Sequence, residues 1–173
     1  GGDIKDAIPF ACALEMIHTY SLIHDDLPCM DDDDMRRGKP SNHIVYGEDI
    51  AVLAGDSLLN LSFETMLNGD AIKSLPADRV LKAAGTLARY SGIHGMIGGQ
   101  FIDIKNEGKA VDLDVLKEMD LKKTAALICA AAEMGCIIAG ADKNKINAAR
   151  EYGESLGLAF QIMDDILDQT STT

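Results

Sequence analysis

The sequence predicts an all-α protein. Apolar residues recur at three- and four-residue steps over several long stretches, which is the spacing of one face of a helix. No stretch alternates apolar and polar residues as a half-buried strand does, and glycine or proline residues separate the periodic stretches. With 173 residues, of which 47% are hydrophobic, the chain is long enough to form one domain with a substantial core.

The first helix is predicted over residues 4–24, with Asp3 as its N-cap. A basic loop follows over 35–42, where Gly38 and Pro40 interrupt helical structure. Further helices are predicted over residues 43–68, 76–90, 113–139 and 144–169, with a glycine-punctuated stretch after residue 90 and a loop at 107–112.

An acidic run directly follows the first predicted helix. It places six aspartates within the ten positions from Asp25 to Asp34. At an effective dielectric constant near 20, two carboxylates ~5 Å apart repel by about 3 kcal/mol. A folded protein that gathers them needs a counterion, and hard divalent cations with oxygen ligands suit that role. The alternative interpretation is a solvated acidic loop.

A second acidic cluster interrupts an apolar stretch near the end of the chain. Asp164 and Asp168 lie about 40° apart on one face of the predicted helix, one turn from each other, with Asp165 between them. Like charges at this spacing destabilise a bare helix. Two such clusters on separate apolar helices therefore favour a divalent-metal site over a solvated surface.

Five further segments accompany these clusters in order along the chain. They are Ser21–Pro28, Arg36–Pro40, Gly98–Gln100, Lys123-Thr124 and Gly157–Gln161. Together with the two clusters, they resemble the trans-isoprenyl diphosphate synthases (polyprenyl synthetases), most closely the bacterial farnesyl diphosphate synthases. The resemblance covers essentially the whole chain.

The resemblance implies a single polyprenyl synthetase domain over residues 1–173, folded as an antiparallel helix bundle around a central cavity. Family members are longer, so we expect this chain to be a partial domain, incomplete at both ends, which need not be active by itself. The resemblance places residues 93–106 along the cavity wall. Gln100 and Asp103 in this stretch are three residues apart, so they share one face of a helix and are expected to line the cavity.

The implied reaction is the head-to-tail condensation of isopentenyl diphosphate with dimethylallyl or geranyl diphosphate, giving farnesyl diphosphate with the help of three Mg²⁺ ions. Alternatives are a geranylgeranyl diphosphate synthase, a class I terpene cyclase and a non-catalytic synthase subunit. The second aspartate cluster and the arginine pair disfavour a cyclase, and the presence of both clusters disfavours a non-catalytic subunit.

By resemblance, Asp25 and Asp31 hold two of the ions and Asp164 holds the third. Asp26, Asp165 and Asp168 are expected in the surroundings of the metals or as occasional ligands. Asp32, Asp33 and Asp34 fit a solvated acidic rim. On an ideal helix Asp25 and Asp31 face about 120° apart, so they can share metals only if the intervening residues bulge out of the helix.

The resemblance also assigns the substrate contacts. It gives Arg36 to the allylic diphosphate and Arg37 to isopentenyl diphosphate, and guanidinium groups bind phosphate oxygens bidentately. Without the resemblance, these arginines read as local charge balance. The catalytic pair Lys123 and Thr124 is expected to bind a diphosphate. Gln161 is expected to contact the same diphosphate or a metal-bound water, and His18 is expected to contact isopentenyl diphosphate. Ordinary structural roles remain open for Lys123 at a helix surface and for the partly buried Gln161 and His18.

Product length is linked to Tyr20 and Ser21, five and four residues before Asp25. Five residues place Tyr20 roughly 7.5 Å down the helix axis from the aspartate. In the family an aromatic residue there closes the cavity floor and favours a fifteen-carbon product. An ordinary core tyrosine is the alternative.

Charge and composition bound the partners and the location. Acidic residues number 28 against 16 basic ones, a net charge of −12, which argues against a nucleic-acid partner. The apolar run 125–139 is too short to span a bilayer and contains Glu133. Of the four cysteines, Cys12, Cys129 and Cys136 are expected as buried, reduced thiols. No signal peptide is evident, so we expect a soluble, cytoplasmic protein without stable membrane insertion, and the resemblance adds a homodimer.

Overall fold

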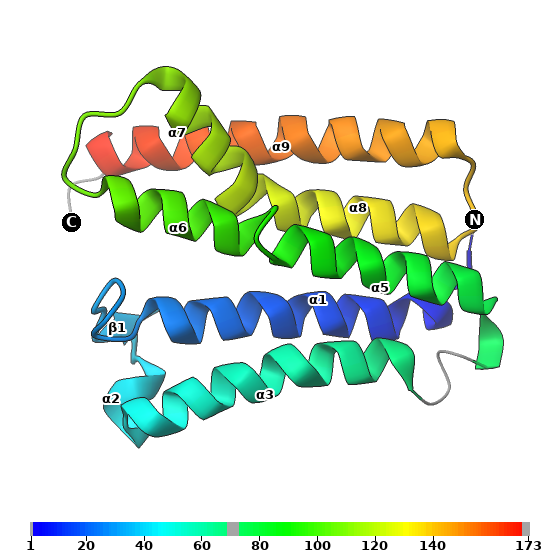
Figure 1. Cartoon of the computed structure of the whole chain (residues 1–173), viewed down its shortest axis with the longest axis horizontal. Coiled ribbons are helices and arrows are strands. Elements are labelled where there is room, and N and C mark those ends of the chain that lie inside the picture. The colour runs from blue at the N-terminus through cyan, green and yellow to red at the C-terminus, as the bar shows by residue number, and fades with distance from the viewer. Residues whose placement is uncertain (1, 69–72, 171–173) are drawn as a thin grey trace.

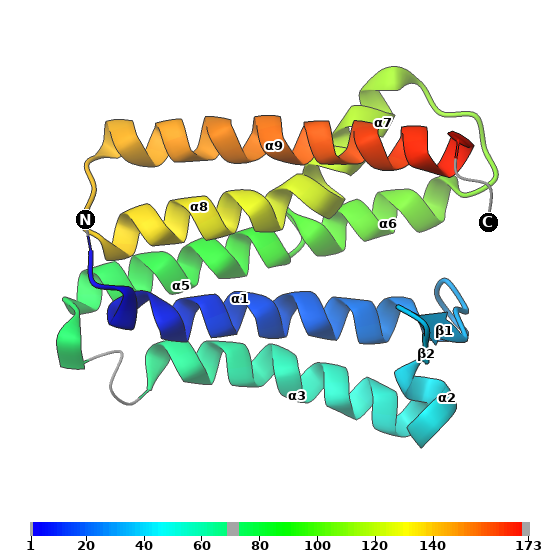
Figure 2. The ribbon, with the colours of Figure 1, turned by 180° about the vertical axis from the view of Figure 1, so that it is seen from behind.

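The computed structural model describes residues 2–68 and 73–170, apart from the side chains of Asp165, Asp168 and Gln169. The predicted all-α fold is confirmed: long helices run side by side along the long axis of the molecule (Figure 1), as the view from behind also shows (Figure 2). The elements are α1 (Ile4–Asp25), β1 (Met35–Arg36), β2 (Lys39–Pro40), α2 (Asn42–Tyr46), α3 (Glu48–Leu67), α5 (Ala77–Ser91), α6 (Met96–Asn106), α7 (Leu113–Asp120), the π-helical turn η1 (Leu121–Ala125), α8 (Ala126–Ile138) and α9 (Lys143–Thr170).

Helix α1 begins as predicted at the Asp3 cap, whose carboxylate accepts a hydrogen bond from the backbone N–H of Lys5 at 2.9 Å. Its buried residues are Phe10, Ala13, Ile17 and Tyr20, at steps of three and four. This stripe faces α3, α5 and α8, so the first helix lies at the centre of the bundle.

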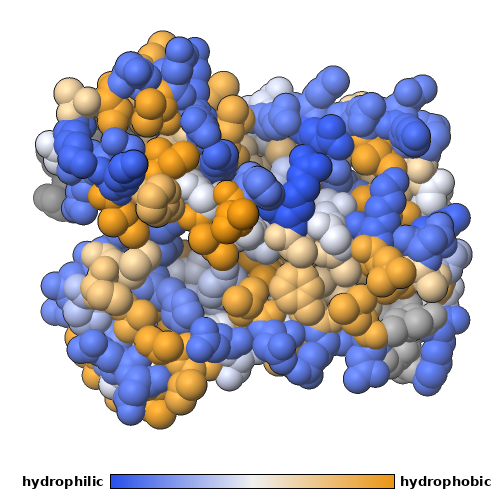
Figure 3. All heavy atoms as spheres, viewed as in Figure 1, coloured by the Kyte–Doolittle hydropathy of each residue, from blue (hydrophilic) through white to orange (hydrophobic). Residues whose placement is uncertain are grey.

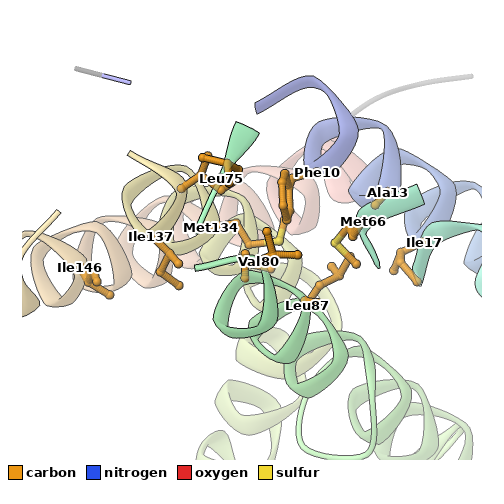
Figure 4. Close-up of a cluster of buried hydrophobic side chains, with 14 of the residues drawn as sticks. Phe10, Ala13, Ile17, Met66, Leu75, Val80, Leu87, Met134, Ile137 and Ile146 are labelled. Atoms are coloured by element: carbon orange, nitrogen blue, oxygen red, sulfur yellow. The ribbon is translucent and has the colours of Figure 1, made fainter. Parts of the chain in front are cut away.

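The hydrophobic core lies where α1, α3, α5 and α8 meet (Figure 4). Phe10 and Ile17 of α1 meet Met66 of α3, Leu87 of α5 and Met134 of α8 there, and all five are at most 2% exposed. Because the core occupies the first part of α1, the last turns of that helix are left to form the wall of a cavity.

A buried carboxylate connects three helices near this core. Glu133 of α8 accepts hydrogen bonds from the Tyr90 hydroxyl of α5 at 2.5 Å and from Nε of Arg150 of α9 at 2.6 Å. Burial acts to raise the pKa of Glu133, but the hydrogen bonds from Arg150 and Tyr90 outweigh it and hold the pKa below its ordinary value. The carboxylate is therefore ionised and paired at neutral pH.

Three sequence-based expectations need correction. The helix predicted over 43–68 is two helices, because Gly47 has a φ of 95° and ends α2 before α3 begins. The loop predicted over 35–42 contains a two-stranded antiparallel hairpin, whose strands are too short to show alternation. The helix predicted over 113–139 is interrupted by η1, five residues of π-helix. Its later part, α8, is a core helix as predicted.

The cysteines agree only in part with the prediction. All four are free thiols; Cys129 is buried and Cys136 is partly buried, but Cys12 is exposed on the outer face of α1. By length and composition alone, one helix of the described part of the chain, α3, is apolar enough to cross a membrane.

Candidate active site

A large cavity of about 920 Å³ opens at the end of the bundle where α1 and α6 terminate. Figure 3 shows hydrophobic side chains on both sides of an indentation at that end. Its volume lies within the range of about 300–1,000 Å³ typical of small-molecule sites. Its walls include Leu14, His18, Tyr20, Ser21 and Asp25 of α1, Leu59 of α3, Ile97, Gln100, Phe101 and Ile104 of α6, Lys123 and Thr124 of η1, Leu127 of α8 and Phe160 of α9.

The segment after α1 brings two aspartates of the first cluster together. Helix α1 ends at Asp25, and the backbone N–H of Asp31 then donates to the Asp25 carbonyl oxygen at 2.9 Å, which closes a compact loop. Asp32 in this loop has a φ of 54°. The spacer thus leaves helical geometry, as the predicted sharing of metals by Asp25 and Asp31 requires.

The electrostatics of this loop favour a bound cation. Burial raises the pKa of Asp25 to about 6, the neighbouring Lys123 acts to lower it, and Asp31 raises it further. Partial burial likewise raises the pKa of Asp31, against the lowering effect of Lys123. Two carboxylates that are each costly to ionise become stable anions when a divalent ion lies between them.

The π-turn η1 presents Lys123 and Thr124 to the cavity from the opposite wall. π-Turns of this kind occur mostly as single insertions in α-helices and often at functional sites. Helix α6 packs closely against the turn at Gly99, where a Cβ atom would lie only 2.4 Å from the backbone nitrogen of Lys123. The Lys123 ammonium forms an ion pair with Asp103 of α6. Close packing and this ion pair together fix the position of the lysine.

Thr124 connects the cavity to the second aspartate cluster. Its hydroxyl donates to Oε1 of Gln161 on α9 at 3.0 Å. Asp164 lies one turn further along α9, is partly buried, and shares the helix face of Gln161. The ends of α9 and α1 that carry the two clusters lie at the same end of the bundle (Figure 1). The predicted roles of Asp165 and Asp168 fall on side chains outside the described part.

The two arginines that follow the acidic run have different surroundings. Arg36 is bound by the buried carboxylate of Asp26, with Nε at 2.8 and 3.0 Å from its two oxygens. Arg37 is exposed at the tip of the hairpin, with a φ of 51°, and Gly38 follows with a φ of 75°. The two arginines, to which the resemblance assigned similar diphosphate contacts, thus differ in their surroundings: Arg36 is paired with a carboxylate and Arg37 is exposed.

Three polar residues lie among the apolar walls. Tyr20 is buried, its hydroxyl has no hydrogen-bond partner in the described structure, and burial, with Asp25 adding to it, raises its pKa to about 12. The amide group of Gln100 is also buried without a partner there. His18 lines the same cavity. Tyr20 forms part of the cavity wall, and Leu14, six residues earlier on α1, lines the cavity as well.

Within the described residues, no three His, Cys, Asp or Glu side chains converge into a complete metal site. Mg²⁺ does not need one, since it keeps several waters and is bound through one or two carboxylates together with substrate phosphates. Asp25 and Asp31, whose backbones are joined by a hydrogen bond, supply two carboxylates for such a site.

Sequence reasoning missed several features of the site. Phe101 and Phe160 line the cavity. Both fall in segments that the sequence analysis singled out, 93–106 and Gly157–Gln161, but neither residue was given a role there. The partner of Lys123, Asp103, was expected only as a cavity-wall residue. The sequence signal for Asp103 was its place three residues after Gln100, which puts both side chains on one face of a helix.

Comparisons with known proteins identify the family of the chain. The polyprenyl synthetase family model matches residues 1–173. The chain is 49% identical over 176 residues to the Arabidopsis thaliana heterodimeric geranylgeranyl pyrophosphate synthase large subunit 1, covering 100% of this chain and 47% of that one. It is 50% identical over 173 residues to the Cyanophora paradoxa geranylgeranyl diphosphate synthase, covering 99% of this chain and 57% of that one.

Solved structures are similar as well. An FPP/GFPP synthase from Zymomonas mobilis superposes with a TM-score of 0.91 at 40% identity, over 99% of this chain and 62% of that one. A geranyltransferase from Helicobacter pylori, complexed with magnesium and isoprenyl diphosphate, gives a TM-score of 0.89 at 39% identity over 96% of this chain and 54% of that one. The chain spans about half the length of the curated relatives it matches. Sequence and structure together show that the chain belongs to the polyprenyl synthetase family.

Proposed function

We propose that the protein containing this chain is a magnesium-dependent prenyltransferase, which condenses isopentenyl diphosphate head-to-tail with dimethylallyl or geranyl diphosphate. One observation carries the proposal: an apolar cavity of about 920 Å³ has Asp25 and Lys123 in its wall, with Asp31 joined to Asp25 at the mouth. A substrate that fits such a site has a long hydrocarbon part and a strongly anionic head. An allylic diphosphate has both.

The chain's own groups would divide the work at the diphosphate. Asp25 and Asp31 would hold magnesium, with Asp164 across the cavity as the ligand of a third ion. When bound, magnesium stabilises the negative charge that develops on the departing diphosphate. Lys123 would donate hydrogen bonds to the diphosphate oxygens. The Thr124 hydroxyl has one hydrogen, which Gln161 accepts in this structure. Thr124 would turn that hydrogen from Gln161 to a diphosphate oxygen when the substrate binds.

The apolar walls would serve the hydrocarbon part of the reaction. As the carbon–oxygen bond of the allylic substrate breaks, an allylic carbocation forms and the double bond of isopentenyl diphosphate attacks it. Side chains such as Phe101, Leu127 and Phe160 line the cavity, and with the substrate bound they would shield this cation from water. The proton lost at the end would go to the departed diphosphate. His18 would lie against the isopentenyl diphosphate.

For the product we propose farnesyl diphosphate, because Tyr20 is buried in the wall about 7.5 Å along the helix from Asp25. Geranylgeranyl diphosphate is the second candidate. It is favoured by Leu14, which lies six residues before Tyr20 and lines the cavity as well, and by relatives named geranylgeranyl synthases.

A homodimer is proposed on the outer face of α3. Ile50, Leu53 and Leu61 share that face at helical spacing and are 44–59% exposed. Light scattering of the whole protein should give twice the chain mass, and Leu53→Glu should shift it to the monomer.

A cytoplasmic location without membrane insertion is also proposed, supported by four free thiols. Fractionation of cells that express the protein tests it.

Product analysis tests the proposed function. The whole protein is incubated with Mg²⁺ and geranyl diphosphate, with and without isopentenyl diphosphate. A synthase forms a longer diphosphate only when both substrates are present. A terpene cyclase consumes the allylic substrate alone, and a non-catalytic subunit consumes neither.

A further inference from the structure

The imidazole of His24 joins the last turn of α1 to α3. Its Nε2 atom lies 3.1 Å from the backbone carbonyl oxygen of Val52, which is 28 positions further along the chain. A carbonyl oxygen can only accept a hydrogen bond, so Nε2 carries the hydrogen. In the neutral ring, Nδ1 is then the nitrogen without a hydrogen. The contact therefore fixes both the orientation and the tautomer of the His24 ring.

Helix α3 accommodates this ring because residue 55 is a glycine. A Cβ atom on Gly55 would lie only 2.0 Å from Nε2 of His24 and 2.4 Å from its Cδ2. Non-bonded carbon atoms approach one another only to about 3.5–4.0 Å. The edge of the imidazole thus lies directly on the backbone of α3, in a slot that any larger residue at position 55 would fill.

The same ring contacts Tyr20, one turn earlier on α1. The two ring centroids lie 5.7 Å apart and the ring planes cross at 78°, which is an edge-to-face arrangement. Aromatic pairs in this geometry attract one another beyond the effect of burial. The Tyr20 hydroxyl has no hydrogen-bond partner in the described structure, so packing holds the phenol ring in place. Both rings line the large cavity.

We propose that Gly55 and His24 are positioning residues for the hydrocarbon part of the cavity: the slot on α3 holds the imidazole, and the imidazole supports the Tyr20 ring against the growing prenyl chain. The inference rests on the proposed function, and it makes α3, as well as α1, a determinant of product length.

The imidazole and a methyl group at position 55 compete for one space, so the two changes should act in opposite directions. His24→Ala removes the ring, which opens space between Tyr20 and α3 for a longer chain. Gly55→Ala displaces the ring from α3, and because the ring lines the cavity, it then takes up cavity space. In the combined variant, the methyl group occupies part of the space that the ring has left.

Product analysis of the whole protein tests this inference, with Mg²⁺, dimethylallyl diphosphate and isopentenyl diphosphate supplied. His24→Ala should raise the ratio of twenty- to fifteen-carbon product about tenfold, and Gly55→Ala should raise the ratio of ten- to fifteen-carbon product about tenfold. The combined variant should return the first ratio to within about threefold of wild type, because the two changes are coupled. The control Gly85→Ala, in open space on α5, should leave the products unchanged.

Nitrogen chemical shifts of the His24 ring give a second measurement, which needs no turnover. At alkaline pH, where free imidazole is neutral, the wild-type ring should show the tautomer with hydrogen on Nε2. The signal is assigned by its loss in His24→Ala. Gly55→Ala should abolish the tautomer preference, because the displaced ring no longer reaches Val52. Circular dichroism verifies that each variant is folded; if Gly55→Ala alone does not fold, the combined variant, which lacks the ring, is compared with His24→Ala.

Three results would overturn the inference. The first is an unchanged product spectrum in His24→Ala. The second is a combined variant whose products are as long as those of His24→Ala, since the methyl group and the ring would then not share a space. The third is a wild-type His24 ring without a preferred tautomer. Failure of the proposed function looks different: the wild-type protein would elongate no substrate, whereas the nitrogen shifts would still show whether Gly55 holds the ring.

Discussion

Replacing Tyr20 by alanine should lengthen the product. The tyrosine is 5% exposed and forms part of the cavity wall, and Leu14, six residues earlier on α1, lines the cavity as well. With the aromatic ring gone, the growing chain can pass the level at which the ring now lies. The main products should then exceed fifteen carbons.

The gain in length follows from the helix geometry. Tyr20 and Leu14 lie about 7.5 Å and about 16.5 Å along α1 from Asp25, at 1.5 Å per residue. The difference is about 9 Å. Each isoprene unit adds four carbon–carbon bonds of about 1.5 Å in a zigzag, or about 5 Å. The variant should therefore accept one or two further units and form twenty- and twenty-five-carbon diphosphates.

The assay is chromatography of the products made by the whole protein from geranyl and isopentenyl diphosphates. Loss of a large buried side chain costs about 3 kcal/mol, which lowers the melting temperature by roughly 6–12 °C for a chain of this size, so assays are run well below it. Tyr20→Phe is the control: it keeps the ring and removes a buried hydroxyl that has no described partner. It should leave the product unchanged and stabilise the fold by up to about 1 kcal/mol. An unaltered product spectrum in Tyr20→Ala would refute the role of Tyr20.

Three further predictions concern stability and binding. Glu133→Gln should destabilise the protein by about 2 kcal/mol at pH 7. Because the pKa of Glu133 in the folded protein is lowered from its ordinary value of about 4.5, the carboxylate stabilises the fold above that pH. This stabilisation should fade as the pH drops through the lower folded pKa. Urea melts of both proteins at several pH values check this, and a difference independent of pH would contradict it. Gly99→Ala should lower the free energy of unfolding by about 1–3 kcal/mol and lower the activity at least tenfold. The reason is that the added methyl group would collide with the backbone of Lys123. The control Gly85→Ala, in open space on α5, should stabilise by up to about 1 kcal/mol, so equal effects of the two changes would contradict the packing role of Gly99. Arg37→Asn should raise the free energy of unfolding by about 0.5–1 kcal/mol, because Asn-Gly suits a type I′ turn. The same change should weaken the binding of isopentenyl diphosphate. Lower stability of the variant in a chemical melt would show that the turn does not strain Arg37.

The helices were predictable where local chemistry determines them. The Asp3 cap and the apolar spacing of α1 depend on neighbouring residues, so they could be recognised in the sequence. The break at Gly47 was less visible, because a glycine inside an apolar helical pattern is usually tolerated and only its positive φ ends α2. The hairpin strands have two residues each, too few for a period of two to appear.

Features that depend on contacts between distant segments could not be predicted in the same way. The π-turn η1 lies where α6 approaches at Gly99, which is 24 positions before Lys123 in the sequence. Asp26 and Arg36 both resemble ligands by residue type, and only the folded chain shows that they bind each other. The approach of Asp31 to Asp25 was predicted as a requirement of shared metals, and the loop geometry meets it.

Extension of an allylic diphosphate tests the central claim most directly. The whole protein is supplied with Mg²⁺, geranyl diphosphate and labelled isopentenyl diphosphate, and the products are identified by mass. We predict label in a fifteen-carbon diphosphate, lost when Mg²⁺ is chelated or when Asp25 is replaced by asparagine. Unchanged elongation in either case, or no labelled prenyl diphosphate from the intact protein, would contradict it.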